Sequence, residues 1–356
     1  MWRDASTLQL GLDPAHAVVI GGLDPQTVRL VESLDGTRDL TGVLSAATGL
    51  GLERWRTGEI LGLLTRAGVL DDGSADRTVL RTLDQRERER LAPDLAAASL
   101  AVDSNDGGAA ALAGRRNSVV SVHGAGRVGA SVTSLLAAAG VGGLAVEDAG
   151  TARLADAAPA GISIDDEGAR RQDAALRAAR RVAPSVRARL RPPEHPDIAV
   201  LAIVGALDPR LPDRLVRRGV PHLFASVREG TGIVGPLVLP GRSSCQRCHD
   251  LHRTDRDPGW PSIAAQLAGT ASQSTAACDV ALATAVAAHA AMQVLAFLDG
   301  DGPAREQLPA VDGTLEIART DGRVRRRSWA RHPLCGCAWP EEMTPGWAPR
   351  GATMGR

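Results

Sequence analysis

Four of the five cysteines form two close pairs that are widely separated in the sequence. Two residues lie between Cys245 and Cys248, and only Gly336 lies between Cys335 and Cys337. Thiolates at such spacings chelate a metal ion from a turn, and four of them complete the tetrahedral shell of Zn2+ without an open position for a substrate. The sequence therefore predicts one structural zinc site with these four cysteines as ligands.

The fifth cysteine, Cys278, comes at the start of an Ala-rich stretch that has the composition of a helix. A helix N-terminus lowers the pKa of a thiol, so Cys278 is a candidate catalytic nucleophile that could form a thioester. No histidine that could serve as its base is close in the sequence. We therefore expect Cys278 to be a small packed side chain, with the catalytic role as the alternative.

Three histidines flank the paired cysteines and carry side chains that can also bind zinc. His249 and His252 follow Cys248, and His332 precedes Cys335. Because four thiolates already close the coordination sphere, we interpret these histidines as surface or turn residues that are at most spare ligands.

A glycine-rich stretch predicts a second kind of chemistry, the binding of phosphate by backbone N–H groups. The apolar run 117–122 leads into His-Gly-Ala-Gly-Arg-Val-Gly, and a helical pattern follows. The glycines permit a tight turn, and the helix N-terminus offers free N–H groups to an anion. A second strand over 143–146 ends where a carboxylate can reach a ribose hydroxyl. The candidate nucleotide-binding residues are Gly124, Gly126, Arg127, Gly129 and Asp148.

The composition argues against several classes of function. The 41 basic and 41 acidic residues balance to a formal charge of zero, so neither a general nucleic-acid binder nor a membrane-surface binder is expected. Every basic residue is Arg, because the sequence contains no Lys. No ammonium group is therefore available as a nucleophile, a Schiff base or a phosphate ligand.

Two further patterns concern the compartment. The N-terminus carries Asp4 and lacks the continuous apolar run of a secretory signal. The longest apolar stretch, 276–298, contains Asp279, His289 and Gln293, so we interpret it as a core helix and not as a membrane span. In a reducing compartment clustered thiols are more often metal ligands than disulfides. We therefore expect a cytoplasmic protein with no membrane partner.

The N-terminal part predicts a small module of its own. Residues 6–21 alternate between short apolar runs and turn residues, which is typical of a β-hairpin. Helical patterns follow over 25–34, 40–48 and 53–67. A hairpin and three helices form a winged-helix-like α+β layout.

The expected domain boundaries follow from these patterns. The winged-helix-like module comprises residues 1–75. A helical linker over 76–116 contains a charged and then apolar helix at 84–98 and the loop Ser-Asn-Asp-Gly-Gly at 104–108. Residues 117–356 form the nucleotide-fold domain with the zinc site.

The charge of the first module decides against DNA. Residues 1–75 contain six Arg against ten Asp and Glu, a formal charge of −4, whereas a surface that binds phosphates needs the opposite sign. The remaining interpretations are a peptide-recognition element and a dimerisation or packing domain, so a homodimer stays open.

A second hairpin is expected over 315–327, where apolar and polar residues alternate around Asp321-Gly322. Arg323, Arg325 and Arg327 would then share one face of a strand. We expect a solvated face and not a nucleic-acid site, and an acidic partner stays open.

These motifs together resemble the ThiF/MoeB superfamily, which includes the enzymes that activate ubiquitin-like proteins. The likeness extends from Asn117 to Trp339 and includes GAGRVG, the strand that ends near Asp148 and GPLVLPG before the first cysteine pair. The resemblance implies an α/β fold: a doubly wound, Rossmann-like ThiF-type domain with a four-cysteine zinc site.

Two longer stretches are similar to a narrower group, the cyclodehydratase or leader-peptide-binding proteins of azole-forming peptide pathways. They are GTGIVGPLVLPGRSSCQRCHDLHRTDRDPGWP and RRRSWARHPLCGC. The first module in turn resembles PqqD-like elements, in which the leader of a precursor peptide adds a strand to the hairpin edge and lies against a helix.

Members of the superfamily that adenylate a carboxylate use a set of charged residues to hold ribose, triphosphate and Mg2+. They have two Asp after the second strand, an Asn and an Arg downstream, a Lys on the next helix and an Asp at the end of the following strand. Only the first Asp is kept here, and the loss of a metal ligand and of a phosphate-binding Arg removes stabilisation of the transition state. The corresponding positions hold Asp148, Gly150, Asp156, Pro159, Arg171 and Val204, with Asp208 as a shifted substitute for the last.

The favoured hypothesis is a non-adenylating scaffold that binds a precursor leader peptide. By resemblance, its partner would be a YcaO-type ATP-dependent cyclodehydratase that converts Cys, Ser or Thr to azolines. The alternative is a ThiF-type adenylyltransferase that acts on the C-terminal carboxylate of a small carrier protein. Zn2+ is the expected cofactor, and binding of ATP is left open.

Overall fold

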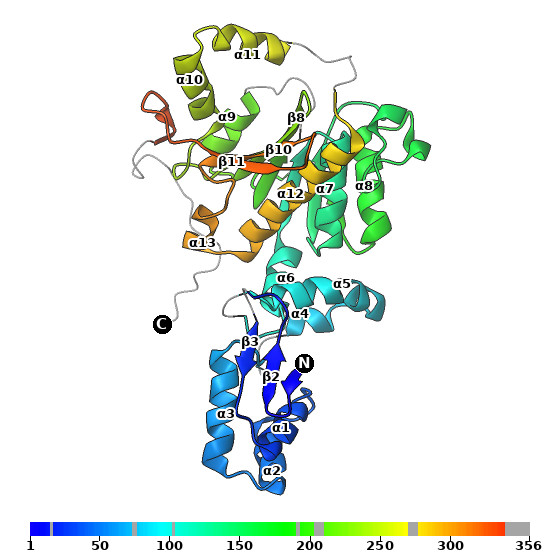
Figure 1. Cartoon of the computed structure of the whole chain (residues 1–356). Helices are drawn as coiled ribbons and strands as arrows, with labels where there is room; N and C mark the ends of the chain where they lie inside the picture. Colours follow the sequence, from blue (N-terminus) through cyan, green and yellow to red (C-terminus); the bar gives the residue numbers. More distant parts are fainter. Residues whose placement is uncertain are drawn as a thin grey trace, which may run out of the picture. The chain divides into compact units, whose positions relative to one another are not determined.

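The computed structural model describes residues 1–14, 17–72, 77–101, 104–189, 193–202, 210–269 and 277–338. It divides into two compact units, Met1–Ala113 and Gly114–Arg356, which contain the small module and the nucleotide fold respectively (Figure 1). Val204, Asp208 and Trp339 lie outside the described residues.

The second unit contains a mixed sheet of eight strands in the order β11-β10-β9-β8-β7-β4-β5-β6. The strands from β6 to β8 in this order are parallel, and β9 to β11 extend the sheet as antiparallel strands. The central strands β4, β5 and β7 are mostly apolar and buried because helices cover both faces of the sheet. The bounds are β4 (Val119–His123), β5 (Gly143–Glu147), β6 (Arg187–Arg189), β7 (Ile198–Leu201), β8 (His222–Arg228), β9 (Thr231–Val238), β10 (Gly313–Ala318) and β11 (Val324–Ser328).

Helices lie on both faces of this sheet. Helix α7 (Arg127–Ala138) packs against α8 (Arg171–Val182) and α12 (Val280–Asp299) on one face. Ile198 and Val200 of β7 belong to the main core on this face of the sheet. The alternate residues Ala199 and Leu201 pack against α9 (Arg210–Arg217) on the opposite face. The doubly wound fold expected from the sequence is confirmed. The remaining helices of this part are α6 (Ala109–Asn117), α10 (Gln246–Arg256), α11 (Trp260–Gly269) and α13 (Gly302–Glu306), with short 3-10 turns at Leu154–Asp156, Ile164–Asp166 and Gly336–Ala338.

Helix α12 is long and apolar enough to cross a membrane by length and composition alone. Half of its most apolar window is buried inside the protein, and it packs against α7, β8 and β9. Its buried Ala287, Ala290 and Ala291 form part of the main core. These contacts agree with the expected core helix.

The first unit has a three-stranded antiparallel sheet, β1 (Trp2–Asp4), β2 (Thr7–Leu10) and β3 (Val18–Ile20), and five helices. The expected hairpin is β2 and β3, and the three expected helices are present. Strand β1 was not expected, because all three of its residues are exposed and show no apolar alternation. The helices are α1 (Pro25–Glu32), α2 (Leu40–Gly49), α3 (Arg54–Arg66), α4 (Thr78–Arg81) and α5 (Gln85–Ala98).

Local sequence signals explain where these helices begin. The Asp24 carboxylate accepts a hydrogen bond from the Thr27 N–H at 2.7 Å, and Pro25 occupies the first helical position of α1. The helices then pack their apolar sides around buried Leu30, Ile60 and Leu64. The module therefore has a core of its own.

One buried ion pair fixes the start of the second unit. The guanidinium of Arg115 donates two hydrogen bonds to the Asp299 carboxylate, at 2.8 and 2.6 Å, and a third to the carbonyl oxygen of Ala139 at 3.2 Å. The segment before β4 is thereby held to the C-terminal end of α12 and to the end of α7.

Replacement of this carboxylate tests the arrangement. Asp299→Asn leaves a largely buried guanidinium without its counter-charge, so we expect the free energy of unfolding to fall by about 1–3 kcal/mol. Urea unfolding monitored by circular dichroism measures it. The control Asp301→Asn removes a carboxylate that is exposed and near Arg305, and it should change stability by less than about 0.5 kcal/mol. Equal effects of the two changes would show that the pair contributes nothing specific.

Candidate functional site

The glycine-rich loop has the predicted strand-turn-helix geometry. Gly124 follows β4 with a φ of 92°, a conformation that favours glycine, and its N–H donates to the carbonyl oxygen of Glu147 at 2.9 Å. A Cβ atom at Gly129 would collide with the carbonyl oxygen of Gly124. The first and third glycines of the motif are therefore required by the turn and by the close approach of α7 to it.

Asp148 connects the ends of the two neighbouring strands β4 and β5. Its Oδ2 accepts a hydrogen bond from the Ala125 N–H at 2.7 Å, and its Oδ1 accepts one from the Gly150 N–H at 2.7 Å. The predicted ribose ligand is thus at the glycine loop. Because the Ala125 N–H already donates to Asp148, it is not available to an anion at the loop.

Arg171, at the start of α8, lies between two carboxylates of this site. Its Nη1 is 3.7 Å from Oδ2 of Asp148, and its Nε is 3.7 Å from Oδ2 of Asp156. A Cβ atom at Gly150 would be 2.5 Å from Nη2 of Arg171, so the guanidinium fills the space beside this glycine. The position where the resembled enzymes have their second Asp is therefore next to a cation, and the acidic pair already has an internal counter-charge.

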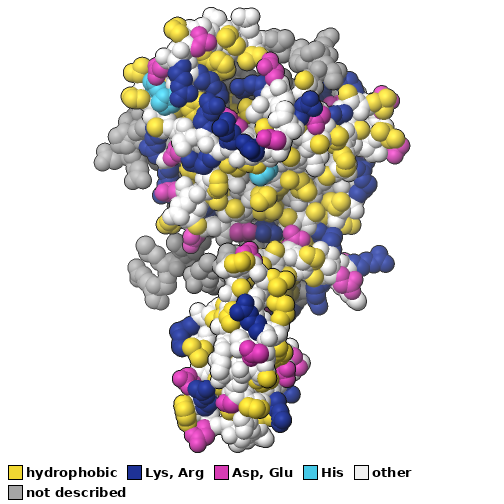
Figure 2. Space-filling model, in the orientation of Figure 1, with side chains coloured by type: hydrophobic (Ala, Val, Ile, Leu, Met, Phe, Trp, Pro, Cys, Tyr) yellow, Lys and Arg dark blue, Asp and Glu magenta, His cyan; other side chains and the backbone are white. Residues whose placement is uncertain are grey.

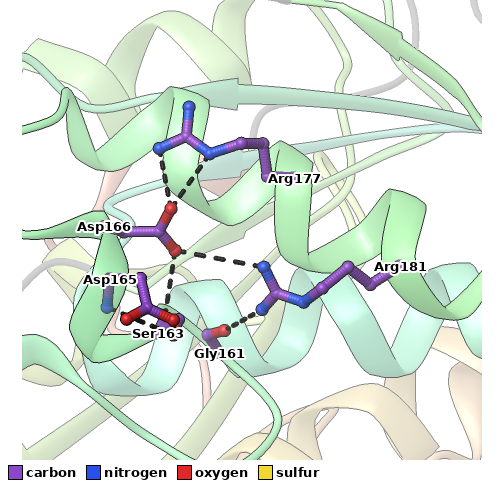
Figure 3. A network of polar contacts seen from close by, with 6 residues as sticks. All are labelled: Gly161, Ser163, Asp165, Asp166, Arg177 and Arg181. Atoms are coloured by element: carbon purple, nitrogen blue, oxygen red, sulfur yellow. Dashed lines mark hydrogen bonds and ion pairs between the residues drawn. The ribbon is translucent and has the colours of Figure 1, made fainter.

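The loop that contains Pro159 is held by a separate network (Figure 3). Arg177 donates to Oδ1 of Asp166 through Nε and Nη2, at 3.0 and 2.8 Å, and the Ser163 N–H donates to Oδ2 at 3.0 Å. Arg181 donates to the carbonyl oxygen of Gly161 at 3.2 Å. Pro159, Asp166 and Arg181 are among the residues that line an open cavity of about 520 Å3. Both arginines of α8 near this loop are therefore used to hold it in place.

Burial alone would raise the pKa of Asp166, but the hydrogen bonds from Arg177 and Ser163 outweigh it and lower the pKa below 3.8. The ion pair accordingly stabilises the fold above the unfolded-state pKa, and this contribution is lost as the pH falls through the lowered value.

Cys278 lies beside the glycine loop, where the Arg127 guanidinium donates to its carbonyl oxygen at 2.8 Å. Burial raises the pKa of the Cys278 thiol, with Arg127 opposing the shift and Asp279 adding to it. Asp279 caps α12 by accepting a hydrogen bond from the Leu282 N–H at 3.0 Å, so Cys278 precedes the helix cap. The thiol is half-buried and packs against the main core. These observations favour the packing role and give no activation of a nucleophile.

The structure brings the four paired cysteines together. Cys245 is the N-cap residue of α10 and Cys248 lies in its first turn, whereas Cys335 and Cys337 flank the start of a 3-10 turn. The Sγ atoms are 3.9 Å apart between Cys245 and Cys248, 3.6 Å between Cys245 and Cys335, and 3.3 Å between Cys248 and Cys337. Four sulfur atoms at 2.3 Å from one tetrahedral ion are about 3.8 Å apart. The cluster therefore has the dimensions that Zn2+ requires.

The mutual effects of these thiols also favour a cation. The hydrogen bond with Cys248 raises the pKa of Cys245 to about 12, and hydrogen bonds with the neighbouring thiols raise the pKa of Cys337. The same contacts lower the pKa of Cys248. Negative charges on neighbouring thiolates repel one another, whereas a dication stabilises all four.

The prediction that the flanking histidines are surface or turn residues is wrong for His249. It holds for His332 as a turn residue, because the carbonyl oxygen of His332 accepts the Cys335 N–H at 2.9 Å. His249 is fully buried, and its ring stacks on Trp329 with centroids 4.6 Å apart. His332 is also buried; it accepts the Leu334 N–H on Nδ1 and contacts Asp255 through Nε2 at 2.8 Å. His252, Asp255 and His332 are close enough to be a second ligand trio. Because both nitrogens of His332 already have partners, we interpret the trio as hydrogen-bonded packing.

The network around Asp166 generates a pH-dependent expectation. Asp166→Asn should lower the free energy of unfolding by about 1 kcal/mol near pH 7. The difference from the wild-type protein should shrink as the pH falls from 3.8 through the lowered native value, because the unfolded chain binds the proton first and the native carboxylate is protonated only below its own lowered pKa. Thermal unfolding at a series of pH values measures it. The neighbouring Asp165→Asn serves as the control, since Asp165 is exposed and bonds only within its own turn. A difference that does not vary with pH would exclude the ion pair as its cause.

Removal of one thiol tests the metal site. We expect one Zn2+ per chain by elemental analysis, and we expect Cys335→Ser to lower the metal content and to destabilise the fold by more than about 3 kcal/mol. The control Cys278→Ser removes a thiol outside the cluster and should leave the zinc content unchanged. A protein that contains no zinc and keeps its stability after Cys335→Ser would contradict the assignment.

Comparisons with known proteins give a consistent result. A comparison with curated proteins gives no match. Solved structures of E. coli MccB match over 94% of this chain and 98% of that chain, with 14% identity and a TM-score of 0.63 for the form with MccA-N7isoASN. The form with ATP has 16% identity, the same coverage and a TM-score of 0.62. PaaA has 18% identity and a TM-score of 0.69, over 93% of this chain and 98% of that chain.

At these identities the matched structures show a shared fold. The coverage means that the first unit, as well as the nucleotide fold, has a counterpart in these proteins. A model of the ThiF family matches residues 103–337, which is more than half of the sequence. With its glycine loop, mixed sheet and four-cysteine cluster, the chain belongs to the ThiF family.

Proposed function

We propose that this ThiF-family chain is a non-adenylating scaffold that binds the leader of a precursor peptide and presents it to a YcaO-type cyclodehydratase. The observation that carries the proposal is the position of Arg171, which occupies the space beside Gly150 and forms ion pairs with both Asp148 and Asp156.

Adenylation places charge on the α-phosphate and on a leaving pyrophosphate, and enzymes stabilise that charge with Mg2+ and basic side chains. A Mg2+ ion at this site would need carboxylates that are free to bind it. Here the guanidinium of Arg171 lies 3.7 Å from each of the two carboxylates. The residue at the phosphate-binding position is Pro159, which has no charge. A nucleotide can therefore be held weakly at the loop without being activated.

The comparisons support a peptide as the ligand. MccB, whose fold extends over nearly the whole of this chain, has been solved with MccA and with related peptides. The first unit is part of that shared fold. A leader peptide recognised by this unit is therefore consistent with both the fold and the composition of the chain.

The sheet of the first unit has an open edge at β3. Met1 and Gln9 exchange two backbone hydrogen bonds, at 2.8 and 2.9 Å, so the N–H and C=O groups of Gln9 point toward β1. Gln9 is opposite Val19 in the β2–β3 register. In an antiparallel sheet the backbone groups of Val19 must then point away from β2. Within the described residues no other strand pairs with β3. Val19 thus offers a free donor and acceptor to an added strand.

Apolar side chains are available for specificity near this module's surface. The Val19 side chain is 49% exposed, and α3 exposes Trp55 and Leu63 by 66 and 48%. A leader strand that pairs with β3 can gain discrimination from such side chains, since backbone pairing alone does not distinguish sequences. The charge of −4 over residues 1–75 favours leaders with basic or apolar anchors.

The partner enzyme is proposed from the resemblance of two stretches, residues 230–261 and 325–337, to the azole-forming group. Each contains one of the cysteine pairs, and together they include β9, α10 and most of β11. In this proposal the second unit contacts the cyclodehydratase, while the first unit holds the leader.

The first test concerns the proposal that this chain does not adenylate a substrate. ATP–pyrophosphate exchange should be undetectable with any precursor peptide or carrier C-terminus, because the charges that stabilise the transition state are absent. The control is Asp148→Ala, which removes the remaining nucleotide-site carboxylate. Clear exchange that is abolished by Asp148→Ala would favour the adenylyltransferase and contradict the scaffold.

The β3 edge generates a test of the peptide-binding half. In the full-length protein Val19→Pro removes the outward N–H, and proline is tolerated at a strand edge, so the fold should be retained. We expect affinity for the leader of a precursor peptide encoded next to this protein, roughly micromolar or about 8 kcal/mol, to fall by about tenfold or more.

The matched control is Val19→Ala, which removes the exposed side chain but keeps the N–H. Fluorescence polarisation of a labelled leader measures both variants. A smaller loss with Val19→Ala than with Val19→Pro supports strand addition. If Val19→Pro binds the leader as tightly as the wild-type protein, the β3 edge is not the binding site.

A further inference from the structure

A cluster of basic side chains lies on the second unit, around Trp329 and the helix that also contains Cys248. Its members are Arg228 at the end of β8, Arg253 and Arg256 on α10, and Arg327 on β11; we call them the arginine cluster. The guanidinium carbons of Arg253, Arg256 and Arg327 lie 5.3, 5.5 and 5.9 Å from the ring centre of buried Trp329. Figure 2 shows basic side chains gathered over this part of the surface.

The cluster carries more positive than negative charge. Arg253 is paired with Asp250 at 3.0 Å and Arg327 with Glu316 at 2.8 Å. Among the described residues no carboxylate lies within ion-pair distance of Arg228 or Arg256. Burial lowers the pKa of Arg253, and the charges of Arg228 and Arg327 lower it further against the opposing effect of Asp250. Like charges are therefore held together at a cost that an anionic partner would offset.

The neighbouring strand β11 provides a surface for backbone pairing. It is the terminal strand of the sheet, and within the described residues its only hydrogen-bonded neighbour is β10. The Trp329 N–H donates to the carbonyl oxygen of Asp312, and the Ala318 N–H to that of Arg323. By alternation, Arg325 and Arg327 direct their backbone groups toward β10, and the intervening Arg326 directs its own toward the open edge.

The side chains of this edge match one kind of partner. Arg325 and Arg327 share a face of β11, and Arg325 is exposed with no carboxylate in ion-pair distance among the described residues. Residues of an added strand opposite them would form close, non-hydrogen-bonded pairs, in which opposite charges are stabilising. Charged edge strands also prevent aggregation, but that role does not require arginines from α10 to gather with Arg327 around one tryptophan.

We propose that β11 and the arginine cluster bind an extended acidic peptide segment. The segment adds to the open edge of β11 and places acidic side chains at alternate positions, next to Arg325 and Arg327 and within reach of the cluster. The guanidinium groups are spread around the Trp329 ring and along β11. Such a spread arrangement fits several carboxylates along one peptide better than it fits a single phosphate group. The inference goes beyond the proposed function, because it concerns the second unit and holds whether or not the first unit captures a leader.

The test uses the full-length protein and two fluorescein-labelled decapeptides of equal composition. One alternates Glu and Thr, and the other has five Glu followed by five Thr. Polarisation titrations at low salt should show about tenfold tighter binding of the alternating peptide, because it alone matches the strand register. A peptide with Lys in place of Glu should not bind.

Charge-removing variants locate the site. A triple variant combines three exposed arginines: Arg228→Gln, Arg256→Gln and Arg325→Gln. Its affinity for the alternating peptide should fall by about tenfold or more, while the thermal unfolding midpoint stays the same. Arg180→Gln, on α8, is the matched control for an exposed arginine and should change the affinity by less than about twofold.

Three results would overturn the proposal. The first is equal binding of the alternating and block peptides, which would indicate attraction without strand pairing. The second is unchanged affinity in the triple variant. The third is displacement of the alternating peptide by pyrophosphate or a single-stranded oligonucleotide at equal concentration, which would make the cluster a phosphate-binding surface.

Discussion

The ion pairs of Arg171 with Asp148 and Asp156 determine what the nucleotide site of this chain can do. The guanidinium lies in space that only a glycine at position 150 leaves open. Asp148 in turn accepts the N–H groups of Ala125 and Gly150, so the cation, the two carboxylates and the loop form one connected unit. A site that the resembled enzymes use to hold Mg2+ and phosphate here has a cation of the protein between its two carboxylates, which offsets part of their negative charge.

The glycine motif has a structural explanation that does not require catalysis. Gly124 needs its positive φ for the turn, and Gly129 must lack a side chain because α7 approaches the carbonyl oxygen of Gly124. Packing alone therefore preserves both residues, and the motif indicates the fold more strongly than it indicates a nucleotide. The four-cysteine cluster similarly serves the fold, since it joins α10 to the segment after β11 at dimensions that suit a closed zinc site.

Much of this was predictable from the sequence because the signals are local. The hairpin at Val18, the cap at Asp24 and the strand-turn-helix around Gly124 all depend on residues that are close in the chain. Long-range contacts gave no such signal. The stacking of His249 on Trp329 joins segments eighty residues apart, so a buried histidine next to a zinc ligand looked like a surface residue. For Arg171 the sequence predicts only that it lies near the position where the resembled enzymes have a Lys. Its contacts with two carboxylates depend on how α8 packs, which the sequence does not reveal. Strand β1 has no apolar pattern because all of its residues are exposed.

The central claim is that Arg171 takes the place of the metal ion, and the Mg2+ dependence of nucleotide binding tests it most directly. Isothermal titration of the zinc-loaded protein with ATP, in the presence of Mg2+ and then without any divalent ion, compares the two states under otherwise equal conditions. We expect any measurable affinity to be weak and the same in both titrations, because Asp148 and Asp156 are already paired with Arg171. An affinity that rises by about tenfold or more with Mg2+, or about 1.4 kcal/mol, would show that the carboxylates release Arg171 to bind the ion and would contradict the account.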